Sequence, residues 1–162
     1  MTDYTTINFA PLLAAAEDEV ITESFVRDVA LPSGGTLALI TLDNGRDHTR
    51  PNTLGPRTLE ALGKVLDEQS ARAAAVEIRA VGITGKPFIF AAGADLSKVS
   101  TLATRENARL MAQYGHHILG KFGTLAVPSF ALATRLALGG AMELALNCHY
   151  RPLDPSAAAL PF

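Results

Sequence analysis

The chain has 162 residues, which is enough for one domain with a buried core and too few for two ordinary domains. Apolar residues make up 48% and charged residues 19%, a balance that excludes an intrinsically disordered chain. The 16 acidic and 14 basic residues give a formal charge of -2, which argues against a nucleic-acid partner held by a basic surface.

Cysteine content and the charge distribution indicate the compartment. The single cysteine, Cys148, excludes a disulfide within the chain and a cysteine-rich zinc site, and we expect no metal. No Lys or Arg precedes Arg27, so we expect no signal peptide. The apolar tract 122–148 is interrupted by Arg135 and Glu143, so we expect no membrane span and no membrane partner. A cytoplasmic, reduced protein is the expectation.

Hydrophobic periodicity predicts the elements in chain order. Residues 1–19 are acidic and lack a pattern, which predicts a weakly ordered lead-in before a domain over 20–162. The elements predicted for that domain are a strand over 23–29, a strand over 36–42, a helix over 56–70, a strand over 76–85, a strand over 88–91, a helix over 102–121 capped by Ser100 or Thr101, a strand over 128–133, a helix over 141–147 and a strand over 148–151. Strands that alternate with helices indicate an α/β architecture.

The first candidate site lies where the strand over 88–91 runs into Ala92, Gly93, Ala94 and Asp95. Small residues at a strand end let a ligand approach the backbone closely. The N–H groups there have no ladder partner and could bind a developing oxyanion. The alternative is a tight turn in which Asp95 is an ordinary turn or cap residue.

The second candidate site is the start of the helix over 141–147. Gly139 and Gly140 precede that helix in an apolar setting, which offers free N–H groups at the positive end of the helix dipole. Glu143 lies in the first turn and is a candidate general acid or base. The alternative is a glutamate that only completes a helix start.

Other polar residues give weaker patterns. His116 and His117 are adjacent on a helix and point in different directions, so we expect solvated or packed histidines rather than metal ligands. Residues 82–86 lack the spacing of a phosphate loop, and no nucleophile-elbow motif occurs. A small basic loop formed by Arg46, His48 and Arg50 could meet a phosphate, although a solvated loop is the preferred interpretation.

The two candidate segments together resemble the crotonase family of enoyl-CoA hydratases and isomerases. Residues 90–95 match its aromatic-Ala-Ala-Gly-Ala-Asp strand end, and residues 137–145 match its Ala-Leu-Gly-Gly-x-x-Glu-Leu-Ala helix start. Residues 39–99 look most like the hydratase domain at the head of bacterial multifunctional fatty-acid oxidation proteins. The resemblance covers about residues 20–151 and implies an α/β, crotonase-like ββα spiral, incomplete at the C-terminus.

The resemblance also implies roles for individual residues. The N–H groups of Ala94 and Gly140 would stabilise the enolate of an acyl-CoA thioester, and Glu143 matches the first of the two hydratase glutamates. The substrate-binding positions that it implies are Ala92, at the adenine edge of the coenzyme A site, with Gly93, Asp95 and Gly139. Coenzyme A would enter as part of the substrate, and no separate cofactor is expected.

The chain departs from the family pattern at several positions. Phe162, the last residue, stands where the family has its second catalytic glutamate. In the family, C-terminal helices that pack the trimer come after that position, beyond this sequence. We therefore expect a weak homo-oligomer. Thr134 and Arg135 replace a small pair, with Arg135 expected to reach solvent. Ala141 replaces a third glycine and His149 replaces an aspartate.

Three functions remain open at the level of the sequence. The first is syn hydration of a 2-enoyl-CoA in fatty-acid β-oxidation, weak or absent in this chain because one acid/base group is missing. The second is a non-catalytic remnant that binds acyl-CoA or a full-length homologue and exposes apolar surface. The third is an isomerase-type reaction that needs only the oxyanion site and one carboxylate.

Overall fold

A computed structural model describes residues 4, 6–47, 49–94 and 104–152 of the chain. The elements in chain order are α1 (Ala10–Ala14), β1 (Glu23–Ala30), β2 (Thr36–Asp43), α2 (Pro56–Ala74), β3 (Ala80–Gly85), β4 (Ile89–Ala91), α3 (Arg105–Thr124), β5 (Ser129–Ala131), β6 (Leu136–Ala137) and α4 (Gly140–Asn147).

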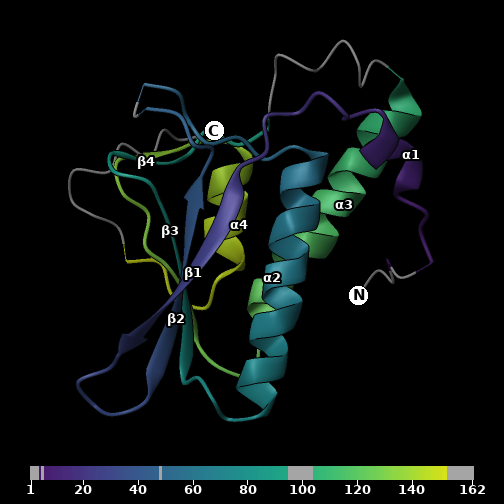
Figure 1. Cartoon of the computed structure of the whole chain (residues 1–162). Helices are drawn as coiled ribbons and strands as arrows, with labels where there is room; N and C mark the ends of the chain where they lie inside the picture. Colours follow the sequence, from purple (N-terminus) through teal and green to yellow (C-terminus); the bar gives the residue numbers. More distant parts are fainter. Residues whose placement is uncertain (1–3, 5, 48, 95–103, 153–162) are drawn as a thin grey trace.

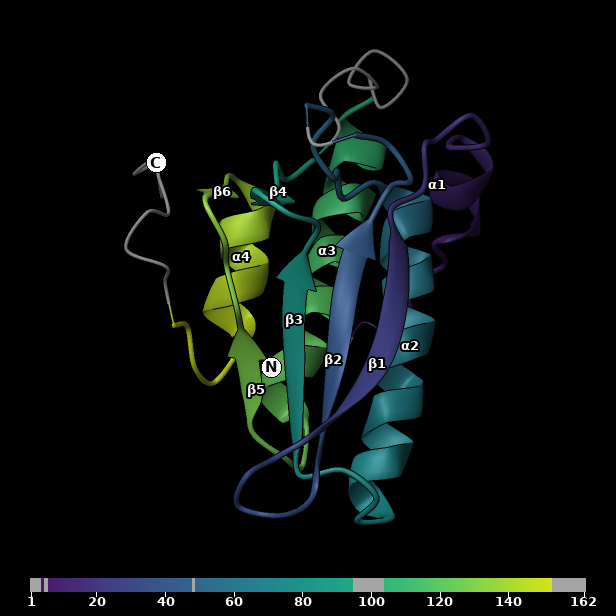
Figure 2. The same ribbon diagram turned by 60° about the vertical axis from the view of Figure 1, so that its left-hand side comes forward.

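The main sheet has the strand order β1-β2-β3-β5. β1 and β2 form an antiparallel hairpin, whereas β2, β3 and β5 run parallel to one another. A second, two-stranded sheet pairs β4 with β6 in parallel. The long helices α2 and α3 lie on one face of the main sheet, together with α4 (Figures 1 and 2). The parallel strands thus end at the same edge, where β4 and β6 meet.

The core lies between the sheet and the helices. Alternate side chains of β2 are buried, as expected for a strand with one face against the core. Ala38, Ile40 and Leu42 are fully buried on the helix side of β2. They belong to one hydrophobic core with Leu59 and Leu62 of α2, which recur at helical spacing. This matches the apolar face predicted for the helix.

The N-terminal segment is more ordered than the sequence predicts. Helix α1 forms within residues 1–19, and its Leu12 is fully buried in the core. The carboxylate of Glu19 accepts hydrogen bonds from the backbone N–H groups of Arg57 and Thr58, at 2.8 and 3.0 Å. Glu19 thus accepts hydrogen bonds from backbone N–H groups in the first turn of α2, and these bonds hold the N-terminal segment against the domain. A weakly ordered lead-in is therefore wrong for residues 9–19, since long-range contacts override local composition.

The end of α2 and the start of β3 differ from prediction because helix α2 is longer than its apolar pattern. α2 continues to Ala74 rather than ending at residue 70, and β3 begins at Ala80 rather than 76. Between them Val76 adopts a left-handed backbone with φ 61°. The N–H of Glu77 donates to the carbonyl of Arg72 at 2.9 Å, closing a Schellman turn.

The later elements are shorter or shifted relative to the predicted ranges. Helix α3 starts at Arg105, and its cap is Thr104, whose hydroxyl accepts from the N–H of Asn107 at 3.1 Å. The caps predicted at Ser100 and Thr101 lie outside the described residues. The strand predicted over 128–133 reduces to β5, and the strand over 148–151 reduces to a bridge between Phe130 and Tyr150.

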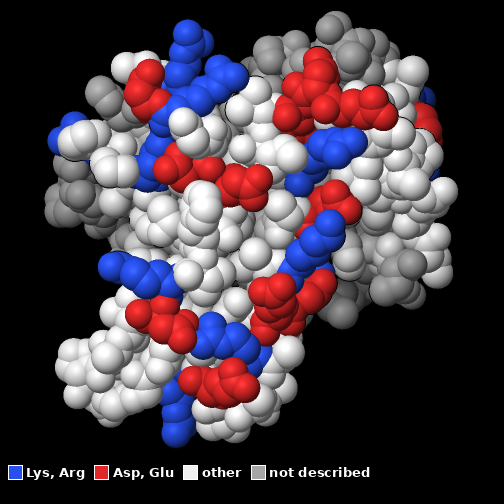
Figure 3. Space-filling view, viewed as in Figure 1, with Lys and Arg blue, Asp and Glu red and all other residues white. Residues whose placement is uncertain are grey.

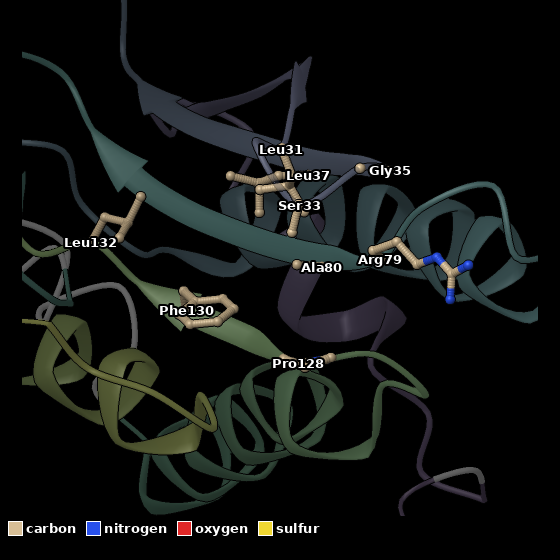
Figure 4. Close-up of a pocket in the computed structure, with 10 residues that line it drawn as sticks. Leu31, Ser33, Gly35, Leu37, Arg79, Ala80, Pro128, Phe130 and Leu132 are labelled. Carbon is tan, nitrogen blue, oxygen red and sulfur yellow. The ribbon is translucent and has the colours of Figure 1, made fainter.

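The other face of the main sheet carries an apolar hollow of about 860 Å³. Leu37, Phe130 and Leu132 project into it from the strands and the residue after β5, and Arg79 lies at one end (Figure 4). Within the described part of the chain no helix covers this face (Figure 2). On the face seen in Figure 3, acidic and basic side chains are interspersed.

Candidate active site

The candidate site forms where the chain after β4 crosses the start of α4. The pairing of Ala91 with Ala137 brings the ends of β4 and β6 together, and Leu138 N–H donates to the Ala91 carbonyl at 3.2 Å. Gly93 follows with φ +82°, and a Cβ there would lie 2.7 Å from Gly140 N and 2.7 Å from Leu138 O. Only glycine allows this approach of two backbones.

Two backbone N–H groups meet at this crossing. Ala94 N lies 3.8 Å from the point that a Cβ on Gly140 would occupy, and both residues line a pocket of about 210 Å³. Neither N–H donates to a backbone or side-chain acceptor in the described part of the chain. An adjacent pair of free donors at the start of a helix can bind an anionic oxygen.

Glu143 lines the same pocket from the first turn of α4. Its side chain is 41% exposed, yet its Oε1 is buried. Glu143 is the fourth residue after the cap Gly139, one position beyond the third residue that closes a capping box. The geometry thus disfavours the interpretation of Glu143 as a mere helix-start residue.

His116, which the sequence analysis predicts to be a solvated or packed histidine, also lines this pocket. Its Nδ1 lies 3.1 Å from Glu143 Oε1. The adjacent His117 instead stacks on Phe9, with ring centroids 6.3 Å apart and planes at 15°. The divergence of the two histidines is as predicted, but one of them points to the site. The available signal was a helical face that His116 shares with the small residues Ala112 and Gly115.

The rest of the pocket is mainly apolar. Leu54, Leu59, Met111 and Leu119 complete its lining. An apolar cavity with a few convergent polar groups is the usual form of a small-molecule site. This pocket suits a ligand with a hydrocarbon chain and one polarisable oxygen.

A buried amide holds the strand ends in place. Asn52 is fully buried, and its Nδ2 donates to the carbonyls of Leu42 and Phe90 at 2.8 and 3.2 Å. The backbone carbonyl of Asn52 accepts from Ala92 N–H at 2.8 Å. Asn52 was not identified from the sequence, since nothing local marks an asparagine whose side chain bonds to two distant strand ends.

Three of the remaining predicted site residues shape the backbone around the pocket, and the fourth lies outside the described residues. Ala92 is half-buried and is held by Asn52, outside the small pocket. Gly93 and Gly139 shape the crossing, with Gly139 as the cap of α4 at φ 50°. Asp95, and with it its interpretation as a turn or cap residue, lies outside the described residues.

The departures from the family pattern have individual explanations. Arg135 is exposed, as predicted, and its guanidinium carbon lies 4.8 Å from the ring centroid of Phe88. Its φ of 50° explains why a small residue suits this position. The Nδ1 of His149 accepts from Ser129 N–H at 3.2 Å, a role open to an aspartate oxygen. Ala141 is fully buried at the start of α4.

Other polar clusters have structural roles. Lys86 is buried, and its Nζ donates to the side-chain oxygen of Asn44 and to the carbonyl of Arg46. It therefore fixes the loop after β2 and is not free to bind a phosphate. The described residues contain no cluster of metal-ligating side chains. Among the same residues, no helix has the length and apolarity needed to cross a bilayer.

No protein-family model matches the chain. Among curated proteins, it is 34% identical over 124 residues to the alpha subunit of the fatty acid oxidation complex of Shewanella amazonensis, an alignment that covers 76% of this chain and 17% of the relative. It is also 34% identical over 105 residues to a probable enoyl-CoA hydratase of Bacillus subtilis, covering 64% of this chain and 40% of that protein.

Solved structures give the same picture for the fold. Pseudomonas aeruginosa DspI superposes with a TM-score of 0.69 at 27% identity, over 83% of this chain and 50% of that one. An enoyl-CoA hydratase from Bacillus anthracis superposes with a TM-score of 0.68 at 26% identity, over 82% of this chain and 48% of that one. The chain thus spans about half the length of these solved proteins.

Proposed function

This chain belongs to the crotonase family of enoyl-CoA hydratases and isomerases, and from that premise we propose that its small pocket binds the thioester of an acyl-CoA. The thioester oxygen accepts hydrogen bonds from the N–H groups of Ala94 and Gly140, and the apolar lining receives the start of the acyl chain. Coenzyme A is part of the substrate and no further cofactor takes part.

The observation that carries this proposal is the pair of N–H groups at the crossing of the two strand ends, which have no acceptor among the described residues. Their fixed positions favour the enolate over the thioester, because negative charge develops on that oxygen only during the reaction. A single donor of this kind is worth about 3 kcal/mol to a transition state.

Glu143 supplies proton transfer next to the thioester. In syn hydration of a 2-enoyl-CoA, it positions and deprotonates the water that adds to the β-carbon while the oxyanion donors hold the enolate. Its place beside Gly140 in one pocket supports this role.

An isomerase-type proton transfer is the second candidate. Glu143 is the one carboxylate among the ten described residues that line the pocket, and a single base suffices to move a proton between two carbons of an enolate. Analysis of the products from a 2-enoyl-CoA and a 3-enoyl-CoA distinguishes the two reactions: the first yields a 3-hydroxyacyl-CoA and the second a shifted double bond.

A thermal melt with excess acyl-CoA tests the shared binding step. A ligand at 100 times its dissociation constant adds about 2.7 kcal/mol of stability, so we expect a clear rise in Tm with acyl-CoA. The free fatty acid is the control, because it lacks the thioester and the nucleotide. An unchanged Tm with acyl-CoA contradicts the proposal, whereas stabilisation without turnover identifies a non-catalytic acyl-CoA binder.

A further inference from the structure

His116 approaches the candidate base from a different helix. It projects from α3, and Glu143 projects from α4, two helices that lie side by side in both ribbon views (Figures 1 and 2). The Nδ1 to Oε1 distance is 3.1 Å, and both residues line the same pocket as Ala94 and Gly140. A titratable pair thus lies beside the oxyanion donors.

The two carboxylate oxygens of Glu143 are not equivalent. Oε1 is buried and accepts no aligned hydrogen bond from the described residues. A buried acceptor without a partner is unfavourable, and Nδ1 of His116, 3.1 Å away, is placed to share a proton with it. Because Oε1 is withdrawn from solvent, Oε2 is the oxygen that can reach a substrate.

The imidazole also connects the carboxylate with solvent. The side chain of His116 is 60% exposed, so a proton held on the ring can leave to water. An imidazole carries a proton on one nitrogen while the other accepts one, which suits it for transfer between a carboxyl group and solvent.

We propose that His116 is a positioning residue for Glu143, which holds Oε1 and passes to solvent the proton that Glu143 removes from the substrate. This inference rests on the proposed function. It gives the site a second proton-carrying group from within the described part of the chain.

The step balances without another reactant. Oε2 of Glu143 takes a proton from the α-carbon, the electrons of that C–H bond pass into the enolate, and the enolate oxygen is held by Ala94 and Gly140. Rotation of the carboxyl group then brings this proton to Nδ1 of His116, which accepts it in the tautomer whose proton is on the opposite nitrogen. The opposite nitrogen releases its proton to water, and exchange with water returns the ring to its starting tautomer. Reversal of these steps in D2O returns deuterium to the α-carbon.

Deuterium exchange into 3-butenoyl-CoA tests the inference, because its α-protons are acidified by both the thioester and the double bond. Wild type, H116A, H116Q and the neighbouring control H117A are compared by mass spectrometry in D2O, and binding is measured separately by calorimetry. We expect H116A to lower the exchange rate about tenfold or more while the Kd changes less than about twofold. H117A keeps the wild-type rate.

Chemical rescue separates a proton role from a structural one. Added imidazole restores exchange in H116A, because truncation leaves space beside Glu143, and fails to restore it in H116Q, whose side chain fills that space. A wild-type rate of exchange in H116A overturns the inference, and so does a failure of imidazole to restore exchange in that variant. Binding without exchange in wild type also overturns it and leaves thioester binding standing. Loss of wild-type binding refutes the proposed function itself.

Discussion

Gly93 is the residue on which the candidate site depends most directly. Its backbone lies in the left-handed region and passes so near Gly140 that no side chain fits between them. We expect G93A to lose about 2 kcal/mol or more of unfolding free energy, from backbone strain and from displacement of α4. Urea denaturation gives the stability, and calorimetry gives acyl-CoA binding, which we expect to be abolished.

Gly34 provides the matched control for that substitution. It has φ +85°, but no atom lies within 4 Å of its Cβ position. G34A therefore carries the strain of the backbone without the steric clash. Wild-type acyl-CoA binding in G34A is expected, and equal losses of stability in the two variants would refute the role of the close approach at Gly93.

Cys148 is a buried thiol with consequences for pH dependence. Burial raises its pKa from 9.0 to about 12. Since the folded chain disfavours the thiolate, the contribution of this thiol to stability is constant below pH 9 and falls as the pH rises toward 12, by up to about 1.4 kcal/mol per pH unit. Urea denaturation at several alkaline pH values measures this slope.

C148A is the comparison that isolates the thiol. The pKa of Tyr114 is also raised to about 12 by burial, and its contribution remains in the variant. We expect a shallower alkaline decline in C148A than in wild type. Identical slopes would contradict the assignment, as would rapid modification of the folded wild-type thiol by a disulfide reagent at neutral pH.

At the scale of elements, the end of α2 carries avoidable strain. Val76 occupies the Schellman position with φ 61°, a conformation that favours glycine, and its side chain is 64% exposed. V76G removes the clash and loses little packing, so we expect a gain of about 1 kcal/mol in unfolding free energy. V76A, which keeps a Cβ, is expected to gain less. A destabilised V76G in urea denaturation would rule out this reading of the helix end.

The element boundaries show what local patterns could predict. β1, β2 and the start of α2 follow from alternation and helical spacing, and the structure confirms them. The end of α2 was missed because its last turn lacks apolar residues and because valine is a poor signal for a left-handed cap. Helix α1 was missed because its order depends on contacts with α2 and α3, which no short pattern contains.

The residues of the candidate site likewise fall into those that a local sequence pattern predicts and those that it does not. Two glycine-containing segments were recognisable because each carries its backbone requirement within a few residues. Asn52 and His116 were not, since each acts on groups far away along the chain: a strand end in one case and a carboxylate on another helix in the other. Residues of this kind become visible only when the fold brings the elements together.

At the scale of the molecule, the exposed sheet face explains the predicted apolar surface. Leu37 and Leu132 line the hollow of about 860 Å³ on that face. We expect the chain to bind a hydrophobic fluorescent dye there, and the double variant L37Q/L132Q to bind it markedly less. L146Q is the control, because Leu146 is 56% exposed on α4 and does not line the hollow. Equal fluorescence in all three proteins would contradict this assignment.

The N–H groups of Ala94 and Gly140 are the central feature of the proposed site, as donors to a thioester oxygen. The most direct measurement is the amide NMR spectrum of the 15N-labelled chain, titrated with an acyl-CoA and with the matching thioether, which lacks the carbonyl. We predict that the Ala94 and Gly140 resonances move downfield with the thioester and much less with the thioether, because only the former offers an acceptor. Unmoved amides, or equal shifts with both ligands, would contradict the oxyanion site.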